Sequence, residues 1–171
     1  HFRIGIIGRI TWTKGLRLLI ELSSLIKKFD SSNDFKFMLY GDISNDISNE
    51  VKMKLLGQSI FSFLGFEQDK DKIYNSVDLV LHLNSKEPLG RVFLEAIDYG
   101  VPFIGLKSGG IAEIANTTNL NSMLVDLDDN LVQSLFERII LVKETYSYFQ
   151  KKMLLAKQLA KDTFDLCKYV Y

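Results

Sequence analysis

One stretch of the chain, Leu79–Ile114, places a strand, a turn, a helix and a second strand in succession, and this order strongly constrains the fold. The apolar run Leu79–Leu81 is typical of a buried parallel strand, and a Pro-Leu-Gly turn follows it. The pattern of Arg91–Tyr99 predicts a helix that ends at Gly100, and Pro102–Ile104 predicts the next strand. Strands joined in this way require a parallel sheet with helices on its faces.

The same alternation of strands and helices extends along the rest of the chain. The expected strands are Arg3–Ile7, Phe35–Tyr40, Ile60–Leu64, Asp78–Leu83, Pro102–Ile104 and Ser122–Val125. Apolar residues at helical spacing predict one helix that reaches Phe29 with Thr13 as its N-cap, and a second that ends before Gly57. Further helices are expected at Asn130–Val142, Tyr146–Lys161 and Phe164–Tyr171. The prediction is an α/β fold: a Rossmann-like, doubly wound parallel sheet of about six strands with helices on both faces and extra C-terminal helices.

Length and composition narrow the possible classes of protein. A chain of 171 residues suits one domain, and 21 basic against 21 acidic residues give no charge argument for a nucleic-acid partner. The lone cysteine, Cys167, excludes an internal disulfide and a cysteine zinc cluster. No signal peptide or membrane-length apolar run is visible, so we expect a cytoplasmic protein. Because the chain opens on His1 without a methionine, we expect an excised domain.

Two carboxylates flank the Pro-Leu-Gly turn. Glu87 lies in the loop after the expected strand, and Glu95 lies about one turn into the expected helix. Loops at the carboxyl ends of parallel strands form the ligand crevice of such a sheet, and the amides at a helix start favour an anion. This arrangement indicates a ligand that carries hydroxyl groups as well as phosphate.

Glycines gather at the same edge of the expected sheet. They are Gly8, Gly41, Gly65 and Gly105, which each directly follow a strand, and Gly90 in the turn after another. Glycine is useful where the backbone must approach a ligand closely, although any one of them also suits an ordinary strand-to-helix turn. Five on one edge favour the ligand crevice.

A set of short motifs appears in a fixed order along Ile4–Asp129. It consists of Gly8-Arg9, Lys14-Gly15, Gly41-Asp42, Phe63-Leu64-Gly65, the E-x7-E pattern Glu87 to Glu95 in EPLGRVFLEA, Gly109-Gly110 and Glu113. In this order the chain resembles the retaining glycosyltransferases of family four, also called glycosyl transferases group one. Two positions depart from the family pattern: Leu89 stands where phenylalanine is frequent, and Asn84 where serine or threonine is common.

The resemblance implies that residues 1–171 form the C-terminal, donor-binding domain of a two-domain enzyme with the B-type (GT-B) fold. Its N-terminal acceptor domain would lie outside this chain, and a peripheral membrane association through that missing domain stays open. The full-length enzyme would be a hexosyltransferase of polysaccharide biosynthesis. It would transfer a sugar from a UDP-sugar or GDP-sugar with retention of configuration, and this domain alone would be inactive.

The resemblance also implies roles for individual residues. Arg9 and Lys14 would neutralise the diphosphate leaving group, Glu87 would lie near the anomeric centre, and Glu95 would accept hydrogen bonds from the ribose. These first three are the expected catalytic residues. The expected donor-binding residues are Gly8, Gly41, Leu64, Gly65, Phe66, Pro88, Leu89, Gly90, Arg91, Glu95, Gly109 and Gly110.

Two other features suggest chemistry but have simpler explanations. His82 lies within an expected strand, where a packed or hydrogen-bonded histidine is the better interpretation than a catalytic one. Asp126 and Asp128 form a D-x-D pattern before an expected helix, which favours a turn and an N-cap over a metal site. We therefore expect no metal and no cofactor.

Two alternatives belong to other functional classes. A dinucleotide-binding oxidoreductase would share the parallel sheet, but the first loop reads GRITWTKG and lacks G-x-G-x-x-G. A non-catalytic, regulatory module that binds a nucleotide sugar is harder to separate, because binding residues can persist without catalysis. Activity of the full-length protein would separate the two.

Overall fold

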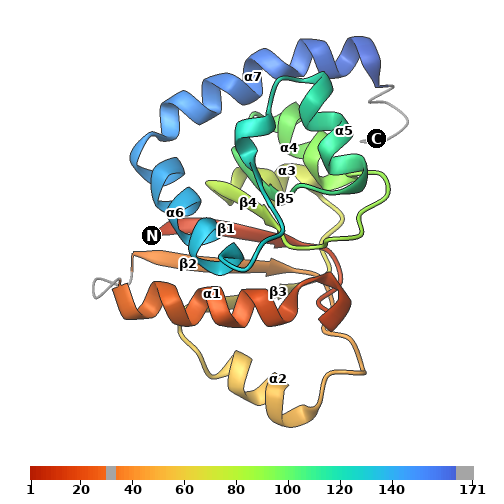
Figure 1. Ribbon diagram of the computed structural model, residues 1–171. Coiled ribbons are helices and arrows are strands. Elements are labelled where there is room, and N and C mark those ends of the chain that lie inside the picture. The colour runs from red at the N-terminus through yellow and green to blue at the C-terminus, as the bar shows by residue number, and fades with distance from the viewer. Residues whose placement is uncertain (30–33, 165–171) are drawn as a thin grey trace.

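The computed structural model describes residues 1–29 and 34–164 and contains a six-stranded parallel sheet (Figure 1). The strands are β1 (Phe2–Ile7), β2 (Phe35–Tyr40), β3 (Phe61–Gly65), β4 (Leu79–His82), β5 (Phe103–Leu106) and β6 (Leu124–Val125). Their order across the sheet is β3-β2-β1-β4-β5-β6, and every neighbouring pair is parallel. The expected doubly wound, Rossmann-like sheet is confirmed.

Seven α-helices in the described part of the chain connect and cover the strands. They are α1 (Leu16–Phe29), α2 (Asn49–Leu56), α3 (Lys70–Asn75), α4 (Arg91–Tyr99), α5 (Gly109–Thr117), α6 (Leu131–Glu144) and α7 (Tyr146–Thr163), with short 3₁₀ turns η1 (Trp12–Lys14) and η2 (Asn121–Met123). Right-handed crossovers place the helices before and after the reversal of strand order on opposite faces. Helix α7 lies over α4 and α5, whereas α6, which follows the last strand and connects no further strand, packs against α1 (Figure 1).

Several predicted boundaries differ from the structure. Thr13 is not the N-cap of α1, because a 3₁₀ turn precedes the helix and Thr11 accepts the capping hydrogen bond from the Lys14 amide. Gly105 lies inside β5 rather than after it, because that strand continues to Leu106. The expected helical piece Phe164–Tyr171 lies, apart from Phe164, outside the described residues, as does Cys167.

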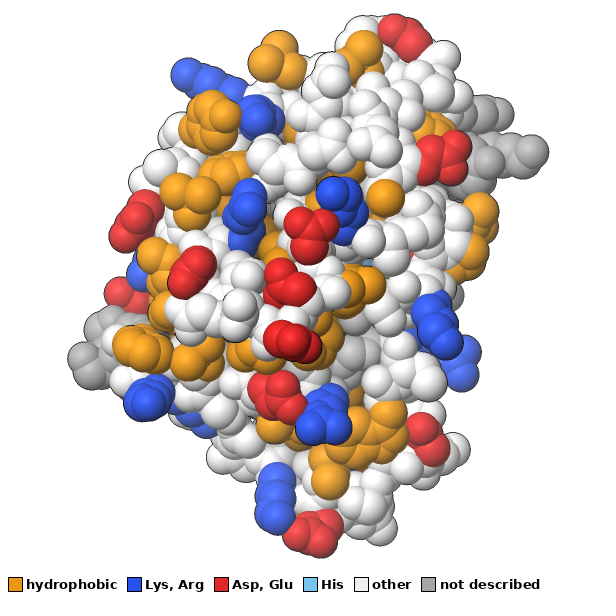
Figure 2. Space-filling view, in the orientation of Figure 1, with side chains coloured by type: hydrophobic (Ala, Val, Ile, Leu, Met, Phe, Trp, Pro, Cys, Tyr) orange, Lys and Arg blue, Asp and Glu red, His pale blue; other side chains and the backbone are white. Residues whose placement is uncertain are grey.

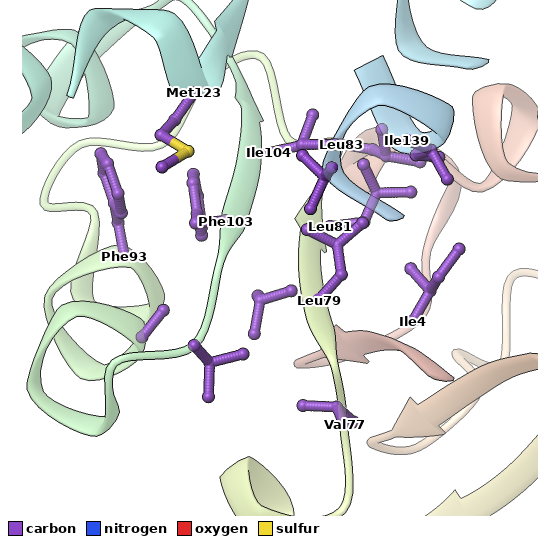
Figure 3. Packing of buried hydrophobic residues seen from close by; sticks show 14 of the residues in the cluster. Ile4, Val77, Leu79, Leu81, Leu83, Phe93, Phe103, Ile104, Met123 and Ile139 are labelled. Carbon is purple, nitrogen blue, oxygen red and sulfur yellow. The ribbon is translucent and has the colours of Figure 1, made fainter. Parts of the chain in front are cut away.

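The core includes the whole of β4 and β5, in which every residue is buried. Alternate side chains of these strands point to opposite faces of the sheet (Figure 3). On one face Leu79 and Leu81 lie on the side of Ile139 from α6, and on the other Phe103 stacks on Phe93 from α4, with ring centroids 4.0 Å apart. Burial on both faces explains why these strands read as continuous apolar runs.

An ion pair fixes the start of β4 beside β1. The Arg3 guanidinium lies 2.7 Å from Asp78 Oδ1, and the Arg3 backbone amide donates to Asp78 Oδ2 at 2.8 Å. These contacts lower the pKa of Asp78 although burial alone would raise it. The pair lies at the amino ends of the strands, so the carboxyl ends of β1 and β4 are left for a ligand.

The surface carries mixed charge. On the face shown in Figure 2, acidic and basic side chains are interspersed with apolar ones. Among the described helices, none has the length and apolar character needed to cross a membrane.

Candidate functional site

A cavity of about 230 Å³ opens where the strand order reverses, at the carboxyl ends of β1 and β4. We call it the switch-point cavity; its walls are residues 6–9, Lys14, residues 81–84, Glu87 and the first turns of α4. In open α/β sheets this reversal point is the usual location of a ligand. The predicted ligand crevice therefore coincides with a cavity.

A second hollow of about 310 Å³ adjoins the first, because both are lined by Ile7, Gly8 and Arg9. We call it the side hollow. It continues toward the ends of β2 and β3, where Tyr40, Gly41, Asp42, Phe66 and Glu67 line it. Phe66 is 69% exposed, so its ring offers an open apolar surface at the rim.

The structure distributes the expected site residues over three groups. Those that line the switch-point cavity are Gly8, Arg9, Lys14, Glu87, Arg91 and Glu95, and those that line the side hollow include Gly8, Arg9, Gly41 and Phe66. The remainder line neither: Leu64, Gly65, Pro88, Leu89, Gly90, Gly109 and Gly110. Among the charged residues of the motif series, Arg9, Lys14, Glu87 and Glu95 thus meet at the switch-point cavity, whereas Asp42 lines the side hollow and Glu113 lines neither.

Arg9 and Lys14 bring positive charge to the switch-point cavity. Both are exposed, and within the described part of the chain neither side chain forms an ion pair or a hydrogen bond. The 3₁₀ turn η1 holds Lys14 in place, since its amide donates to both the carbonyl and the hydroxyl oxygen of Thr11. Two unneutralised cations at the rim suit a multiply charged anion.

Glu87 is held in the cavity wall by several donors. The Asn84 side-chain amide donates to its Oε2 at 3.1 Å, and the Gly90 backbone amide donates to its Oε1 at 3.3 Å. Burial raises the pKa of Glu87, but His82 and these hydrogen bonds outweigh it, so the pKa lies below its ordinary value of 4.5. Glu87 is therefore ionised at neutral pH and is an acceptor rather than a general acid.

His82 lies at the end of β4, packed near the Phe103 ring and facing the same cavity. Its Nε2 is 3.4 Å from Glu87 Oε2 but forms no hydrogen bond within the described residues. Burial lowers the pKa of His82, and Lys14 lowers it further, against the opposing effect of Glu87. The expected packed histidine is confirmed, and it is also a neutral wall residue of the cavity.

Glu95 is 7% exposed and points from α4 toward α3. Lys70 Nζ donates to its Oε1 at 2.8 Å, and the Tyr74 hydroxyl donates to its Oε2 at 2.8 Å. The Arg91 guanidinium is 3.9 Å from the same Oε1. A buried carboxylate requires such partners, because an unpaired charge is costly away from water.

Gly41 and Gly110 are required by contacts between chain segments rather than by open space for a ligand. A Cβ at Gly41 would collide with the carbonyl oxygen of Gly8, and one at Gly110 would lie 2.5 Å from the carbonyl oxygen of Pro88. The Gly110 amide also donates to the carbonyl oxygen of Glu87 at 3.1 Å. The start of α5 thereby contacts and supports the loop that carries Glu87.

Two residues of the site, Lys70 and Tyr74, are absent from the sequence expectations. Their spacing of four residues within KDKIYN places both on one side of a helix, which is the only signal that could have found them. Helix α3 itself was not expected. It has six residues and begins behind the N-cap Asp69, whose side chain accepts from the Lys72 amide.

The D-x-D pattern makes local contacts. Asp128 Oδ1 accepts a hydrogen bond from the Asn130 amide at 2.9 Å, and Asp126 lies 3.3 Å from the Lys107 ammonium. In the part of the chain that the structure describes, no three His, Cys, Asp or Glu side chains are grouped so that they could hold a metal ion.

Comparison with known sequences finds a match to one protein family. The model of the family described as glycosyl transferases group 1 matches residues 1–143. The chain is 30% identical over 130 residues to an uncharacterized 42.6 kDa protein in the cps region of Klebsiella pneumoniae, covering 74% of this chain and 32% of that protein. It is 26% identical over 168 residues to the glycogen synthase of Thermodesulfovibrio yellowstonii, covering 95% and 32% respectively. The chain spans about a third of the length of these relatives.

Solved structures show the same fold. The C-terminal domain of a glycosyl transferase group 1 family protein from Francisella tularensis has a TM-score of 0.74 at 25% identity, covering 95% of this chain and 86% of that one. The Anabaena protein HepE in complex with UDP-glucose has a TM-score of 0.80 at 26% identity, covering 99% of this chain and 46% of that one. The span matched by the family model, residues 1–143, includes every residue that lines the switch-point cavity.

Proposed function

The chain belongs to the glycosyl transferases of group 1, and from this membership we propose that it is the donor-binding C-terminal domain of a two-domain glycosyltransferase of the B-type fold. Its likeness to a separate C-terminal domain, over 95% of this chain and 86% of that one, supports this assignment. The length of its curated relatives, about three times the matched span, supports a further domain in the whole protein.

The ligand in this proposal is a nucleoside diphosphate sugar. The exposed cations Arg9 and Lys14 suit the diphosphate, and the carboxyl groups of Glu87 and Glu95 suit hydroxyl groups of the sugar and the ribose. The side hollow, beside Phe66, suits the base. The complex of the Anabaena neighbour with UDP-glucose supports this class of ligand.

In the proposed reaction the bond between the sugar and the diphosphate breaks, and negative charge grows on the departing diphosphate. Arg9 and Lys14, fixed at the cavity rim, stabilise that charge, and each such donor contributes a few kcal/mol to lowering the barrier. Glu87 accepts a hydrogen bond from the donor sugar and stabilises positive charge near the anomeric carbon. The transfer proceeds with retention, and the departing phosphate helps to deprotonate the acceptor. No metal ion takes part in the proposed reaction.

The observation that carries the proposal is the meeting of five charged residues at one cavity, from two stretches of the chain, residues 9–14 and 87–95: Arg9, Lys14, Glu87, Arg91 and Glu95. Separately each has an ordinary explanation as a surface charge. Together, at the point where the strand order reverses, they form the charge pattern that a nucleoside diphosphate with a sugar requires.

The test is calorimetric titration of the chain with UDP, GDP and ADP, and with the nucleoside of whichever binds. We expect the diphosphate to bind at least about tenfold more tightly than its nucleoside, and the double variant Arg9→Ala/Lys14→Ala to lose most of that preference. EDTA should leave the affinity unchanged. Arg17→Ala is the matched control, because Arg17 is an exposed cation that pairs with Glu21 outside the cavity.

Failure of all three nucleotides to bind would overturn the proposed ligand class. A nucleotide affinity that disappears with EDTA and returns with magnesium or manganese would overturn the metal-free assignment alone.

A further inference from the structure

Helix α3 presents two side chains, Lys70 and Tyr74, to the carboxylate of Glu95 on α4. Each carboxylate oxygen accepts one hydrogen bond from α3. Lys70 Nζ donates to Oε1 and the Tyr74 hydroxyl donates to Oε2, both at 2.8 Å. The two residues are one helical turn apart, so a single helix supplies both bonds. Neither residue lines the switch-point cavity; both reach its wall through Glu95, and the Tyr74 hydroxyl also lies 3.5 Å from the carbonyl oxygen of Val92, another wall residue.

The Tyr74 hydroxyl is a permanent donor. Its side chain is 2% exposed, and burial together with the neighbouring Glu95 charge raises the pKa of Tyr74 well above 10. The hydroxyl therefore keeps its proton at every physiological pH, and Glu95 is the acceptor that it faces.

We propose that Lys70 and Tyr74 are positioning residues that set the plane of the Glu95 carboxylate for the ribose of the donor. The inference rests on the proposed function. A carboxylate has about four acceptor positions, two on each oxygen. With one on each oxygen occupied by α3, one on each stays available, which matches the two neighbouring hydroxyls of a ribose.

Lys70 also offsets the charge of Glu95. Without a cation, a buried carboxylate in the cavity wall would repel the diphosphate that Arg9 and Lys14 attract. Lys70, at 2.8 Å from Oε1, is the nearer cation, and Arg91 is at 3.9 Å from the same atom. Lys70 and Arg91 thus both pair with Glu95, and Lys70 is the closer of the two cations.

The packing around Tyr74 allows the role of its hydroxyl to be tested separately from the role of its ring. The ring stacks on Tyr99 of α4, with centroids 4.8 Å apart and an interplanar angle of 13°. Tyr99 in turn donates to Asp71 of α3 at 2.6 Å. Tyr74→Phe therefore removes the bond to Glu95 and keeps the stacking that docks α3 on α4. Tyr99→Phe is the matched control, because it removes a hydroxyl from the same interface without touching Glu95.

The experiment measures how strongly the chain discriminates between a nucleotide and its counterpart without ribose hydroxyls. Calorimetric titrations use UDP with 2′,3′-dideoxy-UDP, and GDP with 2′,3′-dideoxy-GDP, for the wild-type chain, Tyr74→Phe, Lys70→Met and Tyr99→Phe. We expect the wild-type chain to favour the ribonucleotide at least about tenfold. Tyr74→Phe and Lys70→Met should each reduce that preference about threefold or more, and Tyr99→Phe should leave it unchanged.

The ratio of the affinities for the ribonucleotide and the dideoxynucleotide distinguishes a residue that positions Glu95 from one that only stabilises the fold. A variant that only loosens the fold weakens both nucleotides alike, so its ratio stays that of the wild-type chain. An unchanged ratio in Tyr74→Phe, or an equal fall in Tyr99→Phe, would overturn the inference while the proposed function stands. A wild-type chain that binds the nucleotide without preferring the ribose would also overturn it. If Lys70→Met does not fold, the result for Tyr74→Phe decides the inference. If no nucleotide binds the wild-type chain, the proposed function is refuted, and this inference is refuted with it.

Discussion

At the scale of single residues, the two glutamates of the E-x7-E pattern differ in what surrounds them. Glu87 is held by donors of its own loop, Asn84 and the Gly90 amide, whereas Glu95 is held by another helix. Glu87 is therefore part of the turn that faces the sugar in our proposal, and Glu95 is part of the contact between α3 and α4.

This difference predicts different consequences for Glu95→Gln and Glu87→Gln. Glu95→Gln should weaken binding of the plain nucleotide and of its sugar derivative alike, by roughly 1.5 to 3 kcal/mol, because a charge-assisted bond to the ribose is lost. Glu87→Gln should leave plain nucleotide binding nearly unchanged and lower turnover in the full-length enzyme. Paired titrations with nucleotide and nucleotide sugar, together with steady-state rates, make the comparison. Equal loss of plain nucleotide binding in both variants would refute the placement of Glu87 beside the sugar.

The charged residues of the site were predictable from the sequence, and their supports were not. Arg9, Lys14, Glu87 and Glu95 stand in short motifs whose spacing is visible in the chain. Lys70 and Tyr74 lie 25 and 21 residues from Glu95 and meet it only because α3 docks on α4. Contacts between helices depend on packing across the sheet, and no local pattern encodes them.

At the scale of elements, both boundaries of α4 and the end of α1 at Phe29 were predicted correctly, while the start of α1 was not. Glycines in left-handed conformation, Gly90 and Gly100, bound α4 at both ends, and such residues are visible in a sequence. Helix α1 is preceded by η1, and nothing in TWTKG distinguishes a 3₁₀ turn from the first turn of an α-helix. The alternation of strands and helices predicted a parallel sheet, whereas the order of its strands came only from the structure.

The contact between α5 and the Glu87 loop predicts the effect of Gly110→Ala. Because the new Cβ would meet the backbone of Pro88 and Leu89, which cannot rotate away, the variant should lose roughly 1 to 3 kcal/mol of unfolding free energy. The displaced loop carries Glu87, so affinity for a nucleotide sugar should fall as well. Urea unfolding and titration measure the two effects.

Gly57→Ala is the control for this substitution. Gly57 has an ordinary helical φ of −75° at the end of α2, far in sequence from the site. It should cost less than Gly110→Ala and should leave ligand affinity unchanged. A Gly110→Ala variant as stable as the Gly57→Ala variant would show that the loop yields without strain.

At the scale of the whole molecule, the chain spans about a third of the length of its curated relatives, and the proposed reaction needs a second domain. Positioning of two substrates supplies much of an enzyme's rate, and one domain offers walls for only one of them. We therefore expect the purified chain to bind a donor but to show little sugar transfer. Incubation with UDP-sugars and GDP-sugars and a panel of acceptors, followed by quantification of released nucleotide, checks this. Robust turnover by the chain alone would rule out the two-domain proposal.

The reversal of strand order has a consequence for how a ligand stabilises the molecule. The cavity forms between β1 and β4, two strands that are adjacent in the sheet but separated by β2, β3 and their helices along the chain. The walls of the cavity therefore come from both sides of the reversal, and a molecule bound there contacts both halves of the sheet. Such a molecule opposes their separation by a free energy that rises with the logarithm of its concentration above the dissociation constant, so it protects the sheet as a unit and not one loop at a time.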